Sequence, residues 1–206
     1  MKRVFVFCML VFLFPWLPVA GDHPQEIPRD MQQKIRSIMT LSCDFEQERE
    51  VSVLTEKATS KGKIFYQKSD KLHWQYLTPA RSGFVVNGDG IMITGADGQP
   101  VPDQSSSRIF RQISKIILMG LDGTGLSDSR DFSVTCASGA GSIVVHLSPA
   151  GRDLRKFFTG IDLHFTLPDY IVDKVVICEV SGDKTTIRMK NTVVNKPIDP
   201  LVFKIK

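Results

Sequence analysis

Short segments in which apolar and polar residues alternate run from residue 42 to the end of the chain. In the first of them, Cys43 and Phe45 share one side, and Asp44 and Glu46 share the other. A period of two is typical of a half-buried strand. Further strands are predicted over residues 61–67, 72–76, 84–86, 91–93, 132–136, 142–147, 161–165, 171–179, 185–189 and 201–205. About 10–11 short strands linked by turns predict a mainly β fold with one large antiparallel sheet that curls, as a barrel or a sandwich.

Turn sequences support this division into strands. Asn87-Gly88-Asp89-Gly90 is a strong hairpin turn between two apolar runs, because Asn-Gly and Asp-Gly favour the tight turns that join antiparallel strands. Ser181-Gly182-Asp183 turns the last pair of long strands. The chain shows no internal repeat and no low-complexity linker, so we expect one domain.

Two amphipathic helices complete the prediction. The first opens at Pro28 and ends near Leu41, with Met31, Ile35 and Ile38 at helical spacing. The second follows the serines at 105–107 and ends in the glycine-rich residues 120–125. Its apolar stripe consists of Ile109, Phe110, Ile113, Ile116, Ile117 and Met119. Both stripes need burial, and covering the open side of the curled sheet provides it.

Residues 1–21 have the layout of a secretory signal peptide. Lys2 and Arg3 precede an apolar run from Val4 to Leu17, and small residues follow. This run is shorter than the roughly 20 residues of a comfortable membrane span. We therefore expect cleavage near Gly21 and a soluble, periplasmic mature domain over residues 22–206. An uncleaved N-terminal anchor is the alternative.

Charge and cysteine content restrict the partners. The net charge is +4, and loss of Lys2 and Arg3 lowers it to about +2, too weak a bias to argue for nucleic acid. Three cysteines remain in the mature chain: Cys43, Cys136 and Cys178. An exported protein can form a disulfide, but all three lie in apolar surroundings, which slightly favours buried free thiols.

Motifs for catalysis and for metal binding are absent. The sequence has no G-x-S-x-G, no H-E-x-x-H and no phosphate-binding loop. His73, His146 and His164 lie on different predicted strands, and two of them as neighbours would make a poor metal site. We expect no enzyme activity, no metal and no cofactor.

Three blocks of sequence nevertheless resemble a known family. They are residues 43–48 (CDFEQE), residues 60–88 with the motifs SKGKIFY, KLHWQY, Pro79 and VVNG, and residues 182–187 (GDKTTI) with Asn191 and Asn195 before Phe203. From about Met31 to Phe203 the chain is similar to the periplasmic lipoprotein carrier LolA and its relatives. The family commonly has a basic residue followed by proline before the aromatic strand, where this chain has Lys68-Ser69.

The resemblance implies a fold and a function. LolA-like proteins are half-open antiparallel barrels in which helices form a lid over an apolar concave face. They accept acylated lipoproteins from an inner-membrane ABC transporter and carry them to an outer-membrane acceptor. The resemblance therefore implies a periplasmic lipoprotein chaperone, which we expect to be monomeric. A carrier of another lipid or glycolipid, and a lipoprotein-sensing regulatory protein of the same fold, are the alternatives.

Candidate site residues follow from this reading. Lys68 and Lys71 flank the turn before the aromatic strand and are predicted to face a partner. The apolar residues have a second interpretation as ordinary core. The predicted acyl-binding residues are Phe45, Phe65, Leu72, Trp74, Tyr76 and Phe84 of the sheet, and Ile109, Ile113 and Ile116 of the second helix.

Overall fold

The computed structural model describes residues 26–54, 56–101, 114, 116–123, 126, 129–139 and 141–205. Ten strands, one α-helix and two short 3-10 helices have defined bounds in this part of the chain. In order they are α1 (Arg29–Arg36), β1 (Thr40–Glu50), β2 (Lys57–Gln67), β3 (Lys71–Thr78), β4 (Ser82–Asn87), β5 (Gly90–Thr94), β6 (Phe132–Gly139), β7 (Ser142–Pro149), η1 (Leu154–Lys156), β8 (Phe158–Thr166), β9 (Ile171–Glu179), β10 (Lys184–Val194) and η2 (Pro200–Phe203). Residues 116–122 are also helical.

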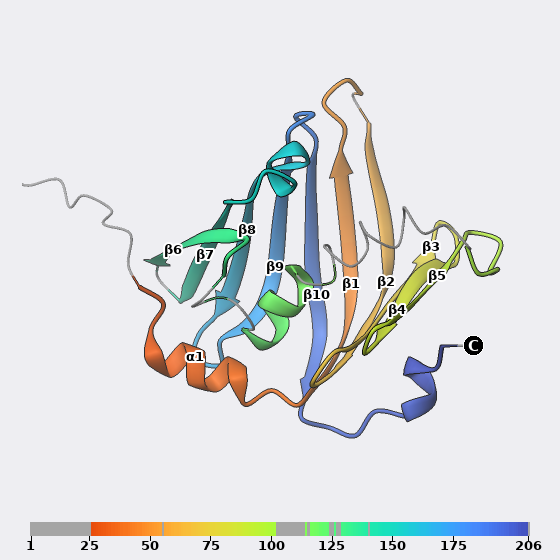
Figure 1. The fold of residues 1–206 in the computed structure, drawn as a ribbon, viewed down its shortest axis with the longest axis horizontal. Helices are drawn as coiled ribbons and strands as arrows, with labels where there is room; N and C mark the ends of the chain where they lie inside the picture. The colour runs from red at the N-terminus through yellow and green to blue at the C-terminus, as the bar shows by residue number, and fades with distance from the viewer. Residues whose placement is uncertain are drawn as a thin grey trace, which may run out of the picture.

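All ten strands form a single antiparallel sheet, as the sequence predicts. Its order is β5-β4-β3-β2-β1-β10-β9-β8-β7-β6, so the first and last strands of the chain pair at its centre. Strands β5 and β6 are the two edges and do not pair, so the sheet stays open. Figure 1 shows the curvature of the sheet, with α1 across one end and the helical residues 116–122 in front of its middle.

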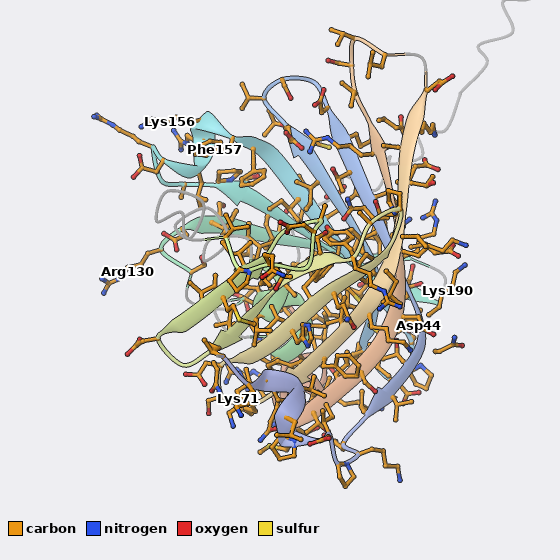
Figure 2. All side chains as sticks on the ribbon, turned by 90° about the vertical axis from the view of Figure 1, so that its right-hand side faces the viewer. Asp44, Lys71, Arg130, Lys156, Phe157 and Lys190 are labelled. Carbon is orange, nitrogen blue, oxygen red and sulfur yellow. The ribbon has the colours of Figure 1, made fainter. Side chains whose placement is uncertain are left out.

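The two faces of the sheet differ in chemistry. Leu41, Cys43 and Phe45 of β1 are at most 5% exposed on the concave face. On the other face Asp44 accepts a hydrogen bond from Lys63 at 2.9 Å, and Lys190 pairs with Glu46 at 2.6 Å. Figure 2 shows Asp44 and Lys190 together on this outer side. The alternation read from the sequence therefore separates core from solvent.

Helix α1 begins where the sequence predicts and ends earlier. Met31 and Ile35 are its buried residues. The backbone N–H of Ser37 donates to the Gln33 carbonyl, and the chain then leaves the helix. The predicted end near Leu41 was wrong, because Leu41 pairs with Tyr66 in the sheet. Strand pairing outweighs the helical spacing of the last apolar residues.

The end of the chain was also predicted incorrectly. Residues 201–205 were expected to form a strand, but residues Pro200–Phe203 form the 3-10 helix η2. Asp199 accepts a hydrogen bond from the backbone N–H of Leu201 and so caps this helix. Phe203 is 1% exposed, and its carbonyl accepts from the Asn87 side chain at 3.1 Å. Side-chain capping and burial of Phe203 fix the short helix.

The three cysteines of the predicted mature chain are free thiols. Cys43 and Cys136 are buried and Cys178 is half-buried. Burial raises the pKa of the Cys43 thiol to about 12, so this thiol stays protonated and unreactive. Among the described residues, no helix is long and apolar enough to cross a membrane.

Candidate functional site

A cavity of about 180 Å³ lies between the concave face of the sheet and the helical residues 116–122. Strands from both halves of the sheet contribute to it, together with Ile116, Ile117 and Gly120 of the helix. The other lining residues are Gln47, Arg49, Trp74, Tyr76, Phe84, Phe158, Leu163, Val175, Ile177, Glu179, Thr185, Ile187 and Met189. Most of these side chains are apolar, so the space suits a hydrocarbon group.

Strand register explains why these side chains converge. Ile187 of β10 faces Val175 of β9 and Gln47 of β1, and residues paired across antiparallel strands share a face. Leu163 of β8 faces Val175 in turn. The half of the sheet near the C-terminus therefore supplies an aliphatic wall.

The other half supplies an aromatic wall. The ring of Phe45 lies 4.5 Å from that of Trp74 and 5.3 Å from that of Tyr76. Trp74 also stacks on Phe84, with 6.4 Å between ring centroids. A side chain at Gly62 would place its Cβ only 2.5 Å from the Phe45 ring, so glycine leaves room for that ring.

Eight of the nine predicted acyl-binding residues fall into three groups. Trp74, Tyr76, Phe84 and Ile116 line the cavity. Phe45 and Leu72 share the concave face but are buried beside the cavity, with 1% and 0% exposure, and do not line it. The predicted positions Ile109 and Ile113 lie outside the described residues.

Phe65 is the predicted residue that the sheet places elsewhere. It pairs with Ser42 and His73, and its ring packs against His73 at 6.0 Å. Ile64 and Tyr66, its neighbours in sequence, are fully buried on the concave face. Placing Phe65 on the apolar concave face was therefore wrong, because alternation along β2 turns it outward.

One end of the cavity is polar. The Arg49 guanidinium lies 3.2 Å from a Glu179 carboxylate oxygen and 3.0 Å from Asp183. The backbone N–H of Ser52 and then Arg49 hold the pKa of Asp183 below its usual value. Sequence reasoning missed this cluster, although Gln47 and Arg49 continue the alternation that begins at Cys43.

A buried hydrogen bond attaches the covering helix to the sheet. The Tyr66 hydroxyl donates to an Asp122 carboxylate oxygen at 2.7 Å. Tyr66 is 0% exposed and Asp122 is 7% exposed. Burial, and next the hydrogen bond to Asp122, raise the pKa of Tyr66. The C-terminal end of helical residues 116–122 is therefore tied to β2.

The two predicted docking lysines lie at the end of the sheet opposite the Arg49 cluster. The Lys68 ammonium donates to the Arg36 carbonyl at 2.5 Å and so supports the last turn of α1. Lys71 begins β3, where it faces Asn87. In Figure 2, Lys71 lies at the lower end of the molecule, whereas Lys156 and Phe157 lie at the upper end.

Comparisons with known proteins agree with this architecture. The family model "Outer membrane lipoprotein carrier protein LolA" matches residues 36–206. The crystal structure of a LolA superfamily protein, NE2245 from Nitrosomonas europaea, superposes with a TM-score of 0.50 at 8% identity, covering 88% of this chain and 99% of that one. No curated protein sequence matches the chain.

Two further solved structures are similar at lower scores. A putative outer membrane lipoprotein-sorting protein domain from Vibrio parahaemolyticus has a TM-score of 0.43 and 8% identity, covering 84% of this chain and 92% of that one. MucB of Pseudomonas aeruginosa, in complex with MucA, has a TM-score of 0.47 and 12% identity, covering 86% of this chain and 59% of that one. The family model matches residues 36–206, which include all ten strands of the sheet, and this shows that the chain belongs to the LolA family.

Proposed function

We propose that this protein is a periplasmic carrier that binds the acyl chains of lipoproteins in the cavity beneath helical residues 116–122. The observation that carries the proposal is an apolar cavity bounded by the concave sheet on one side and by a helix on the other. Membership of the LolA family supports a role in binding lipid or lipoprotein. In this proposal, helical residues 116–122 act as a lid over the cavity.

Cavity size determines how such binding would work. An apolar cavity of about 150 Å³ accommodates one benzene molecule, so about 180 Å³ accommodates only part of an acyl chain. Loading therefore requires the helix to move, so that acyl chain replaces Ile116 and Ile117 against the sheet. Each buried CH₂ group contributes about 0.8 kcal/mol. The net affinity is the difference between burying the acyl chain against the sheet and burying the helix side chains there. Because these two free energies are similar, the carrier can release its cargo without ATP hydrolysis.

The partners follow from the same proposal. Residues 1–21 would direct export and be removed, leaving residues 22–206 as the carrier domain. The carrier would accept acylated lipoproteins from an inner-membrane ABC transporter and deliver them to an acceptor in the outer membrane. Because Lys68 supports α1, Lys71 is the stronger docking position of the two lysines.

A matched pair of substitutions on β9 tests the proposal. Ile177 is half-buried and lines the cavity, whereas Val176 is half-buried and faces Asp162 on the other side of the sheet. Ile177→Glu should weaken binding of a synthetic diacylated lipopeptide by more than tenfold, and Val176→Glu should leave it near the wild-type value. Binding is measured by fluorescence titration of the folded mature protein. Equal affinity of the two variants would contradict the proposal.

A further inference from the structure

One donor in the cavity wall has no partner. Trp74 is 2% exposed, and its indole N–H has no hydrogen-bond partner among the residues that the structure describes. The Tyr76 hydroxyl is the nearest polar group: burial raises its pKa, and the adjacent indole N–H of Trp74 partly offsets that rise. Buried donors are rarely left unpaired, and each exception calls for an explanation. An acceptor on a bound ligand would supply the missing partner.

Neighbouring polar groups present donors as well. The Tyr76 hydroxyl donates to Oε1 of Gln47 at 2.9 Å, which leaves the Gln47 amide nitrogen without an acceptor in the described part of the chain. Glu179 and Asp183 both accept from Nη2 of Arg49, so the other N–H groups of the guanidinium remain available. The indole of Trp74, the amide nitrogen of Gln47 and the guanidinium of Arg49 thus place three kinds of donor at this end of the cavity.

We infer that this end of the cavity recognises the carbonyl oxygen of the ester that links an acyl chain to glycerol. The inference rests on the proposed function and adds the part of the cargo that is recognised. An ester accepts hydrogen bonds and donates none, which complements the donors of Trp74 and Gln47. In a lipid, the ester lies at the end of the hydrocarbon chain. In the cavity, the donors likewise lie beside the apolar wall that includes Leu163 and Ile187.

Charge argues for a neutral group rather than an anionic one. The positive charge of Arg49 is already countered by Glu179 and Asp183. A phosphate or a free carboxylate at this end would face those two acids, and like charges at short range repel. A neutral ester carbonyl carries no such cost. Trp74 and Gln47 are therefore specificity-determining residues for the acyl linkage.

The test compares two lipids that differ in one carbonyl group. 1-Monooleoylglycerol has an ester linkage, and 1-O-oleylglycerol has an ether in its place with the same chain and head group. Each is titrated against the mature protein loaded with the neutral fluorescent probe N-phenyl-1-naphthylamine. The wild type should bind the ester about tenfold more tightly than the ether, the factor expected for one net hydrogen bond.

Two variants and one control test whether the preference for ester over ether comes from Trp74 and Gln47. Trp74→Phe keeps an aromatic ring and removes the N–H, and Gln47→Leu removes the amide. Each should reduce the ester-to-ether ratio to about two or less. Gln75→Leu makes the same kind of change on the opposite face of β3, where Gln75 faces Lys63, and should keep the tenfold ratio. Thermal melting confirms that each variant is folded, and if Trp74→Phe does not fold, Gln47→Leu decides.

The outcomes separate this inference from the proposed function. If the wild type binds ester and ether equally, or if both variants keep the tenfold preference, ester recognition is wrong and acyl-chain binding stands. If neither lipid displaces the probe and a diacylated lipopeptide does not bind either, the proposed function itself fails and the inference fails with it.

Discussion

At the scale of residues, alternation along each strand decides which side chains border the cavity. Trp74 and Tyr76 reach it from β3, whereas Phe65 of β2 packs on the outer face against His73. The sequence was sufficient to predict the members of β3, because their spacing of two is uninterrupted. It was insufficient for Phe65, because Ile64, Phe65 and Tyr66 are consecutive large apolar residues and alternation alone does not show which of them faces inward.

Leu72 tests the distinction between core and cavity wall. It is fully buried and does not line the cavity. Leu72→Glu should therefore destabilise the fold by several kcal/mol, since a buried carboxylate without a partner is costly. Leu77→Glu on the same strand is the control, because Leu77 is 37% exposed. Urea unfolding measures both, and a folded Leu72→Glu variant with wild-type stability would contradict this placement.

His73 makes stability depend on pH. Burial lowers its pKa, and a hydrogen bond to the Val202 backbone opposes that shift only partly. A lowered pKa means that the unfolded chain takes up the proton first as pH falls below about 6.5. The contribution of neutral His73 to the free energy of unfolding is therefore present above pH 6.5, and it is lost as the pH falls toward the pKa of His73 in the folded state.

The corresponding variant is His73→Phe. Its urea midpoint should fall less than that of the wild type between pH 7.5 and pH 5.0. Some dependence should remain, because burial also lowers the pKa of His164. An unchanged pH dependence in the variant would show that His73 does not titrate as the structure indicates.

At the scale of elements, the two ends of the chain show where sequence patterns lose information. The helical spacing of Met31 and Ile35 predicts α1 correctly, but the same spacing continues into residues that pair in β1. Apolar residues at 201–205 suggest a strand, whereas capping by Asp199 produces η2. Both errors arise because tertiary pairing and capping override local periodicity.

The attachment of helical residues 116–122 gives an element-scale prediction. Tyr66→Phe removes one donor to the buried Asp122 carboxylate, and loss of a hydrogen bond to a charged group should cost about 1–3 kcal/mol. Hydrogen exchange should increase over residues 116–122, and acyl-probe binding should tighten, because the empty closed state loses stability. Tyr170→Phe is a matched control that removes a hydrogen bond to Asp30, on α1. If exchange over residues 116–122 rises equally in both variants, the Tyr66 bond does not hold this helix.

The turn between β2 and β3 gives a second prediction at the scale of elements. Lys68→Glu loses the contact with the C-terminal end of α1, where a cation is favourable and an anion is not, so its Tm should fall. Lys71→Glu should leave stability within about 0.5 kcal/mol of the wild type and reduce transfer of lipoprotein to the acceptor. Thermal melting and a transfer assay separate the two roles. Wild-type transfer by Lys71→Glu would remove Lys71 from the docking surface.

At the scale of the whole molecule, one open sheet covered on its concave side explains the fold and the proposed function together. Pairing of β1 with β10 at the centre joins two halves of five strands, one with an aromatic wall and one with an aliphatic wall. The sheet stays open at β5 and β6, and the cavity lies between the two walls. The approximate number of strands, their antiparallel pairing and the two faces were predictable from alternation and turn sequences. The strand order and the polar end of the cavity were not, because they depend on which distant segments pair.

The central claim is that this cavity carries the acyl chains of lipoproteins. The most direct measurement is mass spectrometry of whatever remains bound to the protein after gentle purification from the periplasm of its native cell. We predict a complex of the mature chain with an acylated protein, and we expect Ile177→Glu to abolish it while Val176→Glu retains it. Recovery of the wild-type protein with a free lipid and no acylated protein, or with nothing bound, would contradict the claim.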